Sequence, residues 1–307
     1  KIDDKMYSVP ILFLIFARPE TTRQVFERIR QIQPTKLYVA ADAPRSGHLD
    51  ESNRSKETRR IIDQVDWPCE VHTLFRSENL GCKMAVSSAI TWFFQQEEYG
   101  VILEDDCLPD LSFFRFCEEL LIKYKEDDRI GHIGGNNFFS GIISENLSYD
   151  FCSFSHIWGW ATWRRVWDNY DVNFSFWEDM QFDKKQRRSI FKSINEEIYF
   201  SSFISDAIKN KNRINTWDTQ YFFMLRTQNL LSILPSTNLV TNIGLNDPNA
   251  THTISKKNKE SYILSKSIKF PLNHPKYIMS NREYDDCIIK RKFFSYKRLF
   301  RFLFKDY

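Results

Sequence analysis

The first half of the chain alternates between continuous apolar runs and segments in which apolar residues recur at helical spacing. Val9–Phe16 is a continuous apolar run, which is typical of a strand buried on both faces of a sheet. Thr21–Ile32 follows as a predicted helix, with Thr21 or Thr22 placed to cap it. The same patterns predict strands at Lys36–Ala41, Glu70–Phe75, Val101–Leu103 and Ile130–Ile133, and helices at Lys56–Val65, Cys82–Gln96 and Leu111–Lys125, with a polar loop over residues 45–56.

Strands that alternate with helices predict parallel crossovers. We therefore expect an α/β fold with a mostly parallel central sheet and helices on both faces. In such a sheet, ligands bind at the carboxyl ends of the strands. No GxGxxG follows the first strand and no GxxxxGK[ST] occurs, which argues against dinucleotide binding and against a P-loop.

The second half is less regular and richer in aromatic residues. Ser153–Trp167 contains four tryptophans, of which Trp163 and Trp167 are expected in the core. Beyond it we predict polar helices over Asp183–Asn210, a helix over Asn215–Asn229, a strand over Leu231–Leu234 and a loop over Ser236–Thr253. No flexible linker is evident before about residue 255.

Composition excludes a disordered chain, because 42% of the 307 residues are hydrophobic and 16% are aromatic. No apolar run approaches the roughly 18 residues of a membrane-spanning helix, and no signal peptide is recognisable, although the sequence begins at Lys1 rather than Met. The six cysteines form no CxxC pair, so neither a zinc site nor a disulfide framework is indicated. Reduced thiols favour a cytoplasmic protein.

The net charge of +3 is unevenly distributed. Residues 288–307 contain seven Lys or Arg and one acid, which is +6, so the remainder carries 3 − 6 = −3. A nucleic-acid partner is therefore not indicated for the body of the chain. The basic and aromatic residues over 290–305 suit either a helix on the inner face of an anionic membrane or a helix packed on the domain.

Three acids in a row, Glu104-Asp105-Asp106, directly follow a predicted buried strand. Adjacent carboxylates repel one another and so require a cation. Mn²⁺ or Mg²⁺ accepts oxygen ligands and can bridge to a diphosphate. The alternative is a solvated acidic turn before the helix at Leu111.

With these features the sequence resembles the GT-A glycosyltransferases, which use nucleotide-sugar donors. The acidic triplet and the Leu108–Phe114 segment resemble the pattern of Golgi N-acetylglucosaminyltransferases. Three further segments resemble bacterial glycosyltransferases of polysaccharide and glycoconjugate synthesis, and the likeness covers about residues 8–255. These segments are Arg18–Thr22, Trp158–Trp163, and Asn238–Gly244 ending in Ala250-Thr251-His252.

The resemblance implies roles for individual residues. Asp106 would bind the metal, with His252 as a further ligand unless it is an exposed loop histidine. Asp42 would contact the nucleotide base, although an Asx turn before Ala43-Pro44 explains it equally well. The other donor-binding positions implied are Phe16, Ala17, Arg18, Arg76, Asn79, Glu104 and Asp105.

Inverting transfer requires a carboxylate to accept the proton of the acceptor hydroxyl. Asp218 and Asp179 compete for that role, and both also suit helix N-termini. We assign Asp218, because the bacterial pattern has an acid in a Trp-Asp element, and keep Asp179 as the competitor. A retaining mechanism would need no such base. Trp158, Gly159 and Trp160 are expected to recognise the acceptor or the donor sugar.

Together these features predict a metal-dependent glycosyltransferase with a GT-A domain over 1–255 and a C-terminal extension over 256–307 that ends in a helical tail. Residues 1–135 would bind the nucleotide sugar and 136–255 a glycan or lipid-linked acceptor. A sugar nucleotidyltransferase and a non-catalytic glycan-binding protein are the alternatives. The nucleotidyltransferase would need a Gly-rich, basic loop after the first strand, which Phe16–Glu20 lacks.

Overall fold

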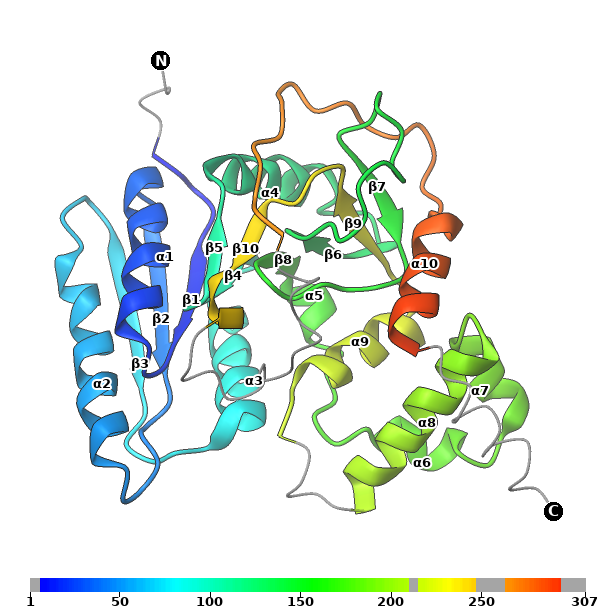
Figure 1. Cartoon of the computed structure of the whole chain (residues 1–307), viewed down its shortest axis with the longest axis horizontal. Helices are drawn as coiled ribbons and strands as arrows, with labels where there is room; N and C mark the ends of the chain where they lie inside the picture. Colours follow the sequence, from blue (N-terminus) through cyan, green and yellow to red (C-terminus); the bar gives the residue numbers. More distant parts are fainter. Residues whose placement is uncertain (1–5, 210–214, 247–262, 294–307) are drawn as a thin grey trace.

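The centre of the protein is an eight-stranded sheet, seen in a computed structural model that describes residues 6–209, 215–246 and 263–293 (Figure 1). The strand order is β3-β2-β1-β4-β8-β6-β9-β7. The strands of this sheet are β1 (Ile11–Ile15), β2 (Lys36–Ala41), β3 (Glu70–Phe75), β4 (Tyr99–Glu104), β6 (Ile130–Gly134), β7 (Tyr149–Cys152), β8 (Trp160–Trp163) and β9 (Leu231–Pro235). A separate two-stranded ribbon pairs β5 (Cys107–Pro109) with β10 (Val240–Asn242).

The sheet is mostly parallel, as the sequence predicts. Strands β1 to β4 pair in parallel, and so do β6 and β9. Only β8 and β7 run against their neighbours, and β8 lies between β4 and β6. The α/β fold class with helices against both faces is therefore confirmed.

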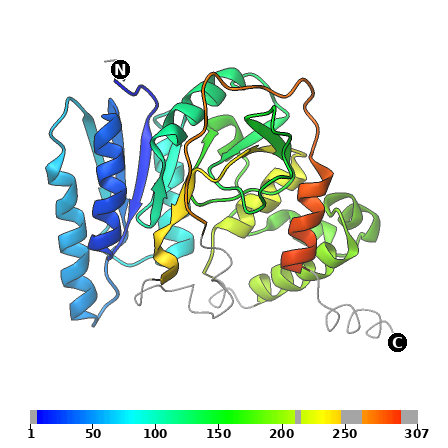
Figure 2. The same cartoon turned by 45° about the horizontal axis from the view of Figure 1, so that its top comes forward.

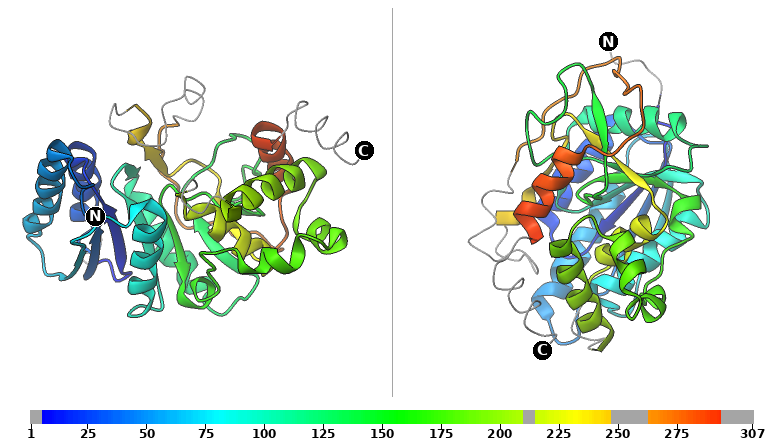
Figure 3. Two further views of the ribbon diagram at one scale, coloured as in Figure 1. Left: turned by 90° about the horizontal axis from the view of Figure 1, so that it is seen from below. Right: turned by 90° about the vertical axis from the view of Figure 1, so that its right-hand side faces the viewer.

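Helices connect the strands and also form much of the second half of the chain. Around the sheet lie α1 (Pro19–Ile32), α2 (Leu49–Arg60) with a 3₁₀ turn (Ile61–Gln64), α3 (Gly81–Phe94), α4 (Leu111–Lys123) and α5 (Arg164–Trp167). Beyond these are α6 (Ser175–Met180), α7 (Lys184–Ile190), α8 (Ile194–Lys209), α9 (Asp218–Thr227), a 3₁₀ turn (Ile243–Asn246), α10 (Arg282–Ile288) and a π-helical turn (Ile289–Phe293). Figure 3 shows that α6–α8 lie at the opposite end of the molecule from α1 and α2.

Three local predictions were wrong. Helix α2 begins at Leu49, inside the predicted loop, because its buried stripe consists of Glu51, Ser55 and Thr58 and shows no apolar period. The loop predicted over 236–253 contains β10, a short strand recognisable only by its pairing with β5. In α1, no side chain caps the N-terminus; the hydroxyls of Thr21 and Thr22 instead donate to the Arg18 carbonyl.

The apolar side chains form two clusters. The larger lies on the sheet and includes Trp163 and Trp167, as predicted. The smaller packs α6–α10 around Phe223, which is fully buried. Each fully buried Val, Leu, Ile or Phe contributes about 1.5–3 kcal/mol.

The segment 263–293 crosses the body of the protein and leads into α10 and the π-helical turn that follows it (Figure 2). Ile268 and Leu272 join the larger cluster, while Tyr284 and Ile288 join the smaller. Within the described ranges no helix is long and apolar enough to span a membrane. Most of the predicted basic tail, residues 294–305, lies outside these ranges.

Candidate functional site

The carboxyl ends of β1 and β4 meet at the acidic triplet. These strands pair in parallel with Leu14 opposite Glu104, so the residues that follow each strand emerge side by side. The Arg18 guanidinium forms ion pairs with both Asp105 and Asp106, and Nη1 lies 2.8 Å from Asp106 Oδ2. Burial would by itself lower the pKa of Arg18, but Asp105 and Asp106 raise it, so the guanidinium stays charged.

Asp105, which follows β4, hydrogen-bonds to the segment that follows β1. One carboxylate oxygen accepts the Phe16 N–H at 3.0 Å and the other accepts from Arg18. The side chain is buried, and this burial raises the pKa of Asp105 although Arg18 opposes the shift. Because both oxygens already have partners, Asp105 positions its neighbours.

The segment after β10 packs against Asp106. The Ile243 N–H donates to the Asp106 carbonyl at 2.8 Å. A Cβ added at Gly244 would lie 2.3 Å from Asp106 Oδ2 and 2.9 Å from Arg18 Nη1. Only glycine therefore allows this segment to lie against the Arg18–Asp106 pair.

The charge of an acid on α9, Asp218, acts on Glu104. Burial, followed by the charges of Asp106, Asp105 and Asp218, raises the pKa of Glu104 to about 8, with Arg18 opposing. The Glu104 side chain makes no hydrogen bond or ion pair with the other described residues. The Thr216 hydroxyl and the Thr219 N–H both donate to Asp218 Oδ1. The tertiary fold thus brings Asp218 within electrostatic range of Glu104, the last residue of β4.

Asp179 lies elsewhere. It is exposed on α6, in the group of helices that forms the smaller apolar cluster, and it is not among the charges that act on Glu104. His252 lies outside the described residues, so its role as a metal ligand stays a prediction.

The donor set at the triplet suits a hard divalent cation held by few protein ligands. No group of three or more His, Cys, Asp and Glu within the described ranges is arranged to hold a metal ion. Mg²⁺ is commonly held by one or two carboxylates together with substrate phosphates and water. Among the residues that the structure describes, Asp106 Oδ1 contacts only the Cys107 thiol, at 3.5 Å, and the Glu104 carboxylate has no partner, so these two acids would hold the ion.

Asp42 ends β2 and organises the loop before α3. Its carboxylate accepts the N–H groups of Ala43, Leu80 and Gly81 at 3.0–3.1 Å. These bonds are not an Asx turn, because the residue two positions on is Pro44, which has no N–H. Contact with a nucleotide base stays a prediction. Asn79 Nδ2 donates to the Ala43 carbonyl at 2.6 Å, in the same loop.

Arg76 directly follows β3. The donor-binding residues predicted after the four parallel strands therefore lie along one edge of the sheet. The Arg76 guanidinium donates to Ser88 Oγ at 2.7 Å. Whether this edge receives a nucleotide stays a prediction.

The predicted sugar-recognition loop requires a correction. Trp160 is fully buried and stacks on His132 and Trp217, so its ring belongs to the core and cannot contact a sugar there. Trp158 is partly exposed and packs edge-on against Phe138. Gly159 has φ +69°, and a Cβ there would lie 2.8 Å from Val240, which explains the glycine through packing.

One polar element was missed. Gly134-Gly135-Asn136-Asn137 follows β6, and the Asn136 amide donates to the Val240 carbonyl at 3.0 Å while its buried Oδ1 has no partner among the described residues. The sequence signal that could have revealed this element is the Gly-Gly-Asn-Asn run directly after the predicted strand. Its contact with β10 could not be predicted, because it joins segments that are far apart in sequence.

No protein-family model and no curated protein matches the chain. The chain is distantly similar to solved structures at 10% identity. HddC from Yersinia pseudotuberculosis matches 57% of this chain and 84% of its own with a TM-score of 0.31, and a second HddC structure is complexed with GMP-PN. The inositol-1-phosphate CTP transferase from T. maritima matches 56% and 77% with a TM-score of 0.33. 4-Diphosphocytidyl-2C-methyl-D-erythritol synthase from Anaerococcus prevotii matches 72% and 99% with a TM-score of 0.32. Since these similarities are weak, we infer no activity from them, and the α/β class follows from the strand topology itself.

Proposed function

We propose that the protein transfers a sugar from a nucleotide-diphosphate donor to a hydroxyl group of a glycan or lipid-linked acceptor. The observations that support the proposal are the position of Glu104 and Asp106 at the carboxyl end of β4 in a parallel sheet and the charge of Asp218, which acts on Glu104. Ligands of such sheets bind at this edge. Asp218, on α9, would supply the base, and Glu104 with Asp106 would supply the place for a cation.

Asp218 would accept the proton of the acceptor hydroxyl. As that oxygen bonds to the anomeric carbon, the bond from this carbon to the diphosphate oxygen breaks, and the electron pair leaves with the nucleotide diphosphate. The Thr216 hydroxyl and the Thr219 N–H hold Asp218 Oδ1, which leaves Oδ2 to take the proton. A bound Mg²⁺ or Mn²⁺ would offset the charge of the leaving diphosphate.

Arg18 would keep the acids in place before the donor binds. Its guanidinium neutralises part of the charge of Asp105 and Asp106. A cation held by Asp106 and Glu104 would then lie beside the positive charge of Arg18. Asp105, whose oxygens are both occupied, would position the strand ends instead of touching the donor.

The alternative within this fold class is sugar nucleotidyl transfer, a reaction of the kind that the name of the inositol-1-phosphate CTP transferase describes for that protein. Such an activity would need a nucleotide-binding loop after β1. Here β1 ends at Ile15 and α1 begins at Pro19, so only three residues, none of them glycine, connect the two.

The test is an assay of the full chain with UDP-, GDP-, CMP- and dTDP-sugars, with and without Mn²⁺, for release of the free nucleotide. Parallel reactions with nucleoside triphosphates and sugar phosphates would detect pyrophosphate from the alternative activity. We expect metal-dependent turnover of one nucleotide sugar that EDTA abolishes. Pyrophosphate release alone, or no turnover and no thermal stabilisation by any nucleotide with Mn²⁺, would refute the proposal.

Substitutions assign the roles. We expect Asp218→Asn to lower kcat by about 10²–10⁴-fold, the usual contribution of a general base, without raising the donor KM. Asp106→Ala should abolish the Mn²⁺ dependence. Asp179→Asn is the matched control and should stay within twofold of the wild type. Loss of activity in Asp179→Asn with activity kept in Asp218→Asn would reverse the assignment.

A further inference from the structure

Helix α7 and the residues around it present a group of cations without anionic partners. Residues 182–194 contain five Lys or Arg and one acid, a net charge of +4. Arg187 is paired with Glu197 at 3.4 Å, and Asp183 caps α7 by accepting the N–H groups of Lys185 and Gln186. The remaining cations are exposed and form no ion pair with another described residue; they are Lys184, Lys185, Arg188 and Lys192.

An apolar side chain projects beside these cations. Phe182, in the turn before α7, is 87% exposed, more than any other large hydrophobic residue in the described part of the chain. Ile194, at the start of α8, is also exposed. Holding a phenylalanine in water forgoes the free energy that its burial would provide. Scattered single residues of this kind are common, but a protruding aromatic within a basic patch has a specific physical use.

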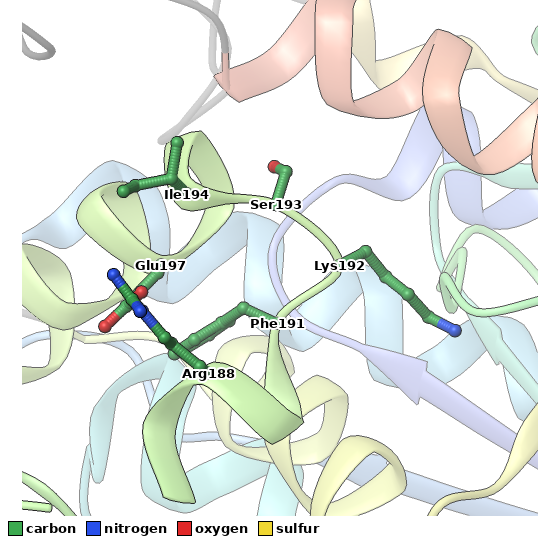
Figure 4. A pocket seen from close by; sticks show the side chains of 6 residues that line it. All are labelled: Arg188, Phe191, Lys192, Ser193, Ile194 and Glu197. Carbon is green, nitrogen blue, oxygen red and sulfur yellow. The ribbon is translucent and has the colours of Figure 1, made fainter. Parts of the chain in front are cut away.

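The same patch contains a shallow hollow between α7 and α8. Its lining residues are Arg188, Phe191, Lys192, Ser193, Ile194 and Glu197 (Figure 4). At the start of α8, Ser193 Oγ accepts the Glu196 N–H, and the Glu196 carboxylate accepts the Lys192 N–H.

The position of the patch ties it to the basic end of the chain. Helix α8 contacts the π-helical turn Ile289–Phe293, so the +6 segment 288–307 begins on the same group of helices. Figure 1 shows this group beside the carboxyl edge of the sheet, where the candidate site lies. The described start of the second basic segment thus contacts α8, the helix that directly follows the first basic segment along the chain.

We propose that the surface of α7 and its flanking turns docks on an anionic lipid bilayer, with Phe182 inserted among the head groups and the exposed cations around it. Interfacial binding of this kind combines buried apolar area with attraction to anionic lipids. Each basic residue near such a surface contributes about fivefold in partitioning. The proposal does not depend on the sugar-transfer reaction.

The experiment is flotation of the full chain with phosphatidylcholine vesicles, with and without phosphatidylglycerol. We expect binding only when phosphatidylglycerol is present. Lys184→Gln with Lys185→Gln should weaken binding by about fivefold for each charge, and Phe182→Ser by about tenfold. The matched control removes two exposed cations from α2, at the far end of the molecule, by Lys56→Gln with Arg60→Gln, and should bind as the wild type does.

Three outcomes would overturn the proposal. The first is equal binding to both kinds of vesicle. The second is wild-type binding by the α7 variants, with binding lost only when Lys297, Arg298 and Arg301 are changed to Gln. The third is retention on heparin that depends on α7 without any binding to vesicles, which would assign the surface to an acidic polymer. Unchanged melting temperatures would establish that the variants are folded.

Discussion

Gly244 is the residue on which the geometry of the acidic site depends most directly. An alanine there would force Asp106 and Arg18 apart, since its Cβ would lie 2.3 Å and 2.9 Å from their polar atoms. We predict that Gly244→Ala destabilises the fold by about 1–3 kcal/mol, the usual cost of overpacking, and reduces metal-dependent turnover. Thermal melts and the nucleotide-release assay would measure both effects.

Gly134→Ala is the control for this prediction. A Cβ at Gly134 meets its nearest atoms at 3.4 Å, an ordinary van der Waals distance. Equal melting temperatures for Gly244→Ala and the wild type would mean that the segment after β10 does not pack against Asp106.

A second residue, His132, allows a prediction of how stability depends on pH. It is fully buried against Trp160, and its ring nitrogens lie 3.2 Å from the Tyr221 hydroxyl and 3.1 Å from the His156 carbonyl. Burial lowers the pKa of His132 to about 3, below the unfolded value of about 6.5. The unfolded state therefore binds the proton first, and stability is full above pH 6.5 and falls as the pH drops toward 3.

The free energy of unfolding should decrease by about 1.5 kcal/mol between pH 6.5 and pH 5. Urea titrations at several pH values would measure it, and His132→Gln should flatten the dependence. An equally steep dependence in that variant would show that other groups cause it.

At the scale of elements, α2 shows how a helix can be fixed by polar burial. Glu51 is buried in its first turn and accepts the backbone N–H of Arg45 at 2.6 Å as well as its guanidinium. We predict that Glu51→Ala lowers the free energy of unfolding by about 1–3 kcal/mol, because the backbone N–H and the guanidinium of Arg45 lose a buried, charged acceptor.

Glu57→Ala on the same helix is the control, since Glu57 pairs with Arg23 on the surface and such pairs contribute about 0–1 kcal/mol. Chemical denaturation would compare the two variants. Equal losses of stability would contradict the role given to Glu51.

At the scale of the whole molecule, the C-terminal segment belongs to the body of the fold. Residues 263–293 supply apolar side chains to both clusters, and Asp285 accepts the Ser153 N–H at 2.9 Å. We predict that a chain ending at Tyr262 is insoluble or unfolded, whereas a chain ending at Phe293 melts within a few degrees of the full chain. Calorimetry and circular dichroism would compare them. Cooperative melting of the shorter chain would support a boundary near residue 255.

Local sequence pattern was sufficient for the features that depend on near neighbours. The apolar runs of β1 and β4 have no polar interruption, so burial on both faces was predictable without knowing their partners. The acidic triplet was recognisable for the same reason, because its position after β4 is a matter of adjacent residues. The segment that forms α7 was also predicted, but only as part of a polar helical region.

The rest depended on contacts between distant segments. Trp160 and Trp158 are two residues apart, yet one is core and the other partly exposed, because β8 enters the sheet between β4 and β6. The charge of Asp218 acts on Glu104, although the two residues are more than a hundred positions apart in sequence. The sequence by itself therefore determined the fold class and the acids at the strand end, since both follow from local periodicity. Only the tertiary structure decided which side chains face those acids, because burial and charge depend on which distant elements pack together.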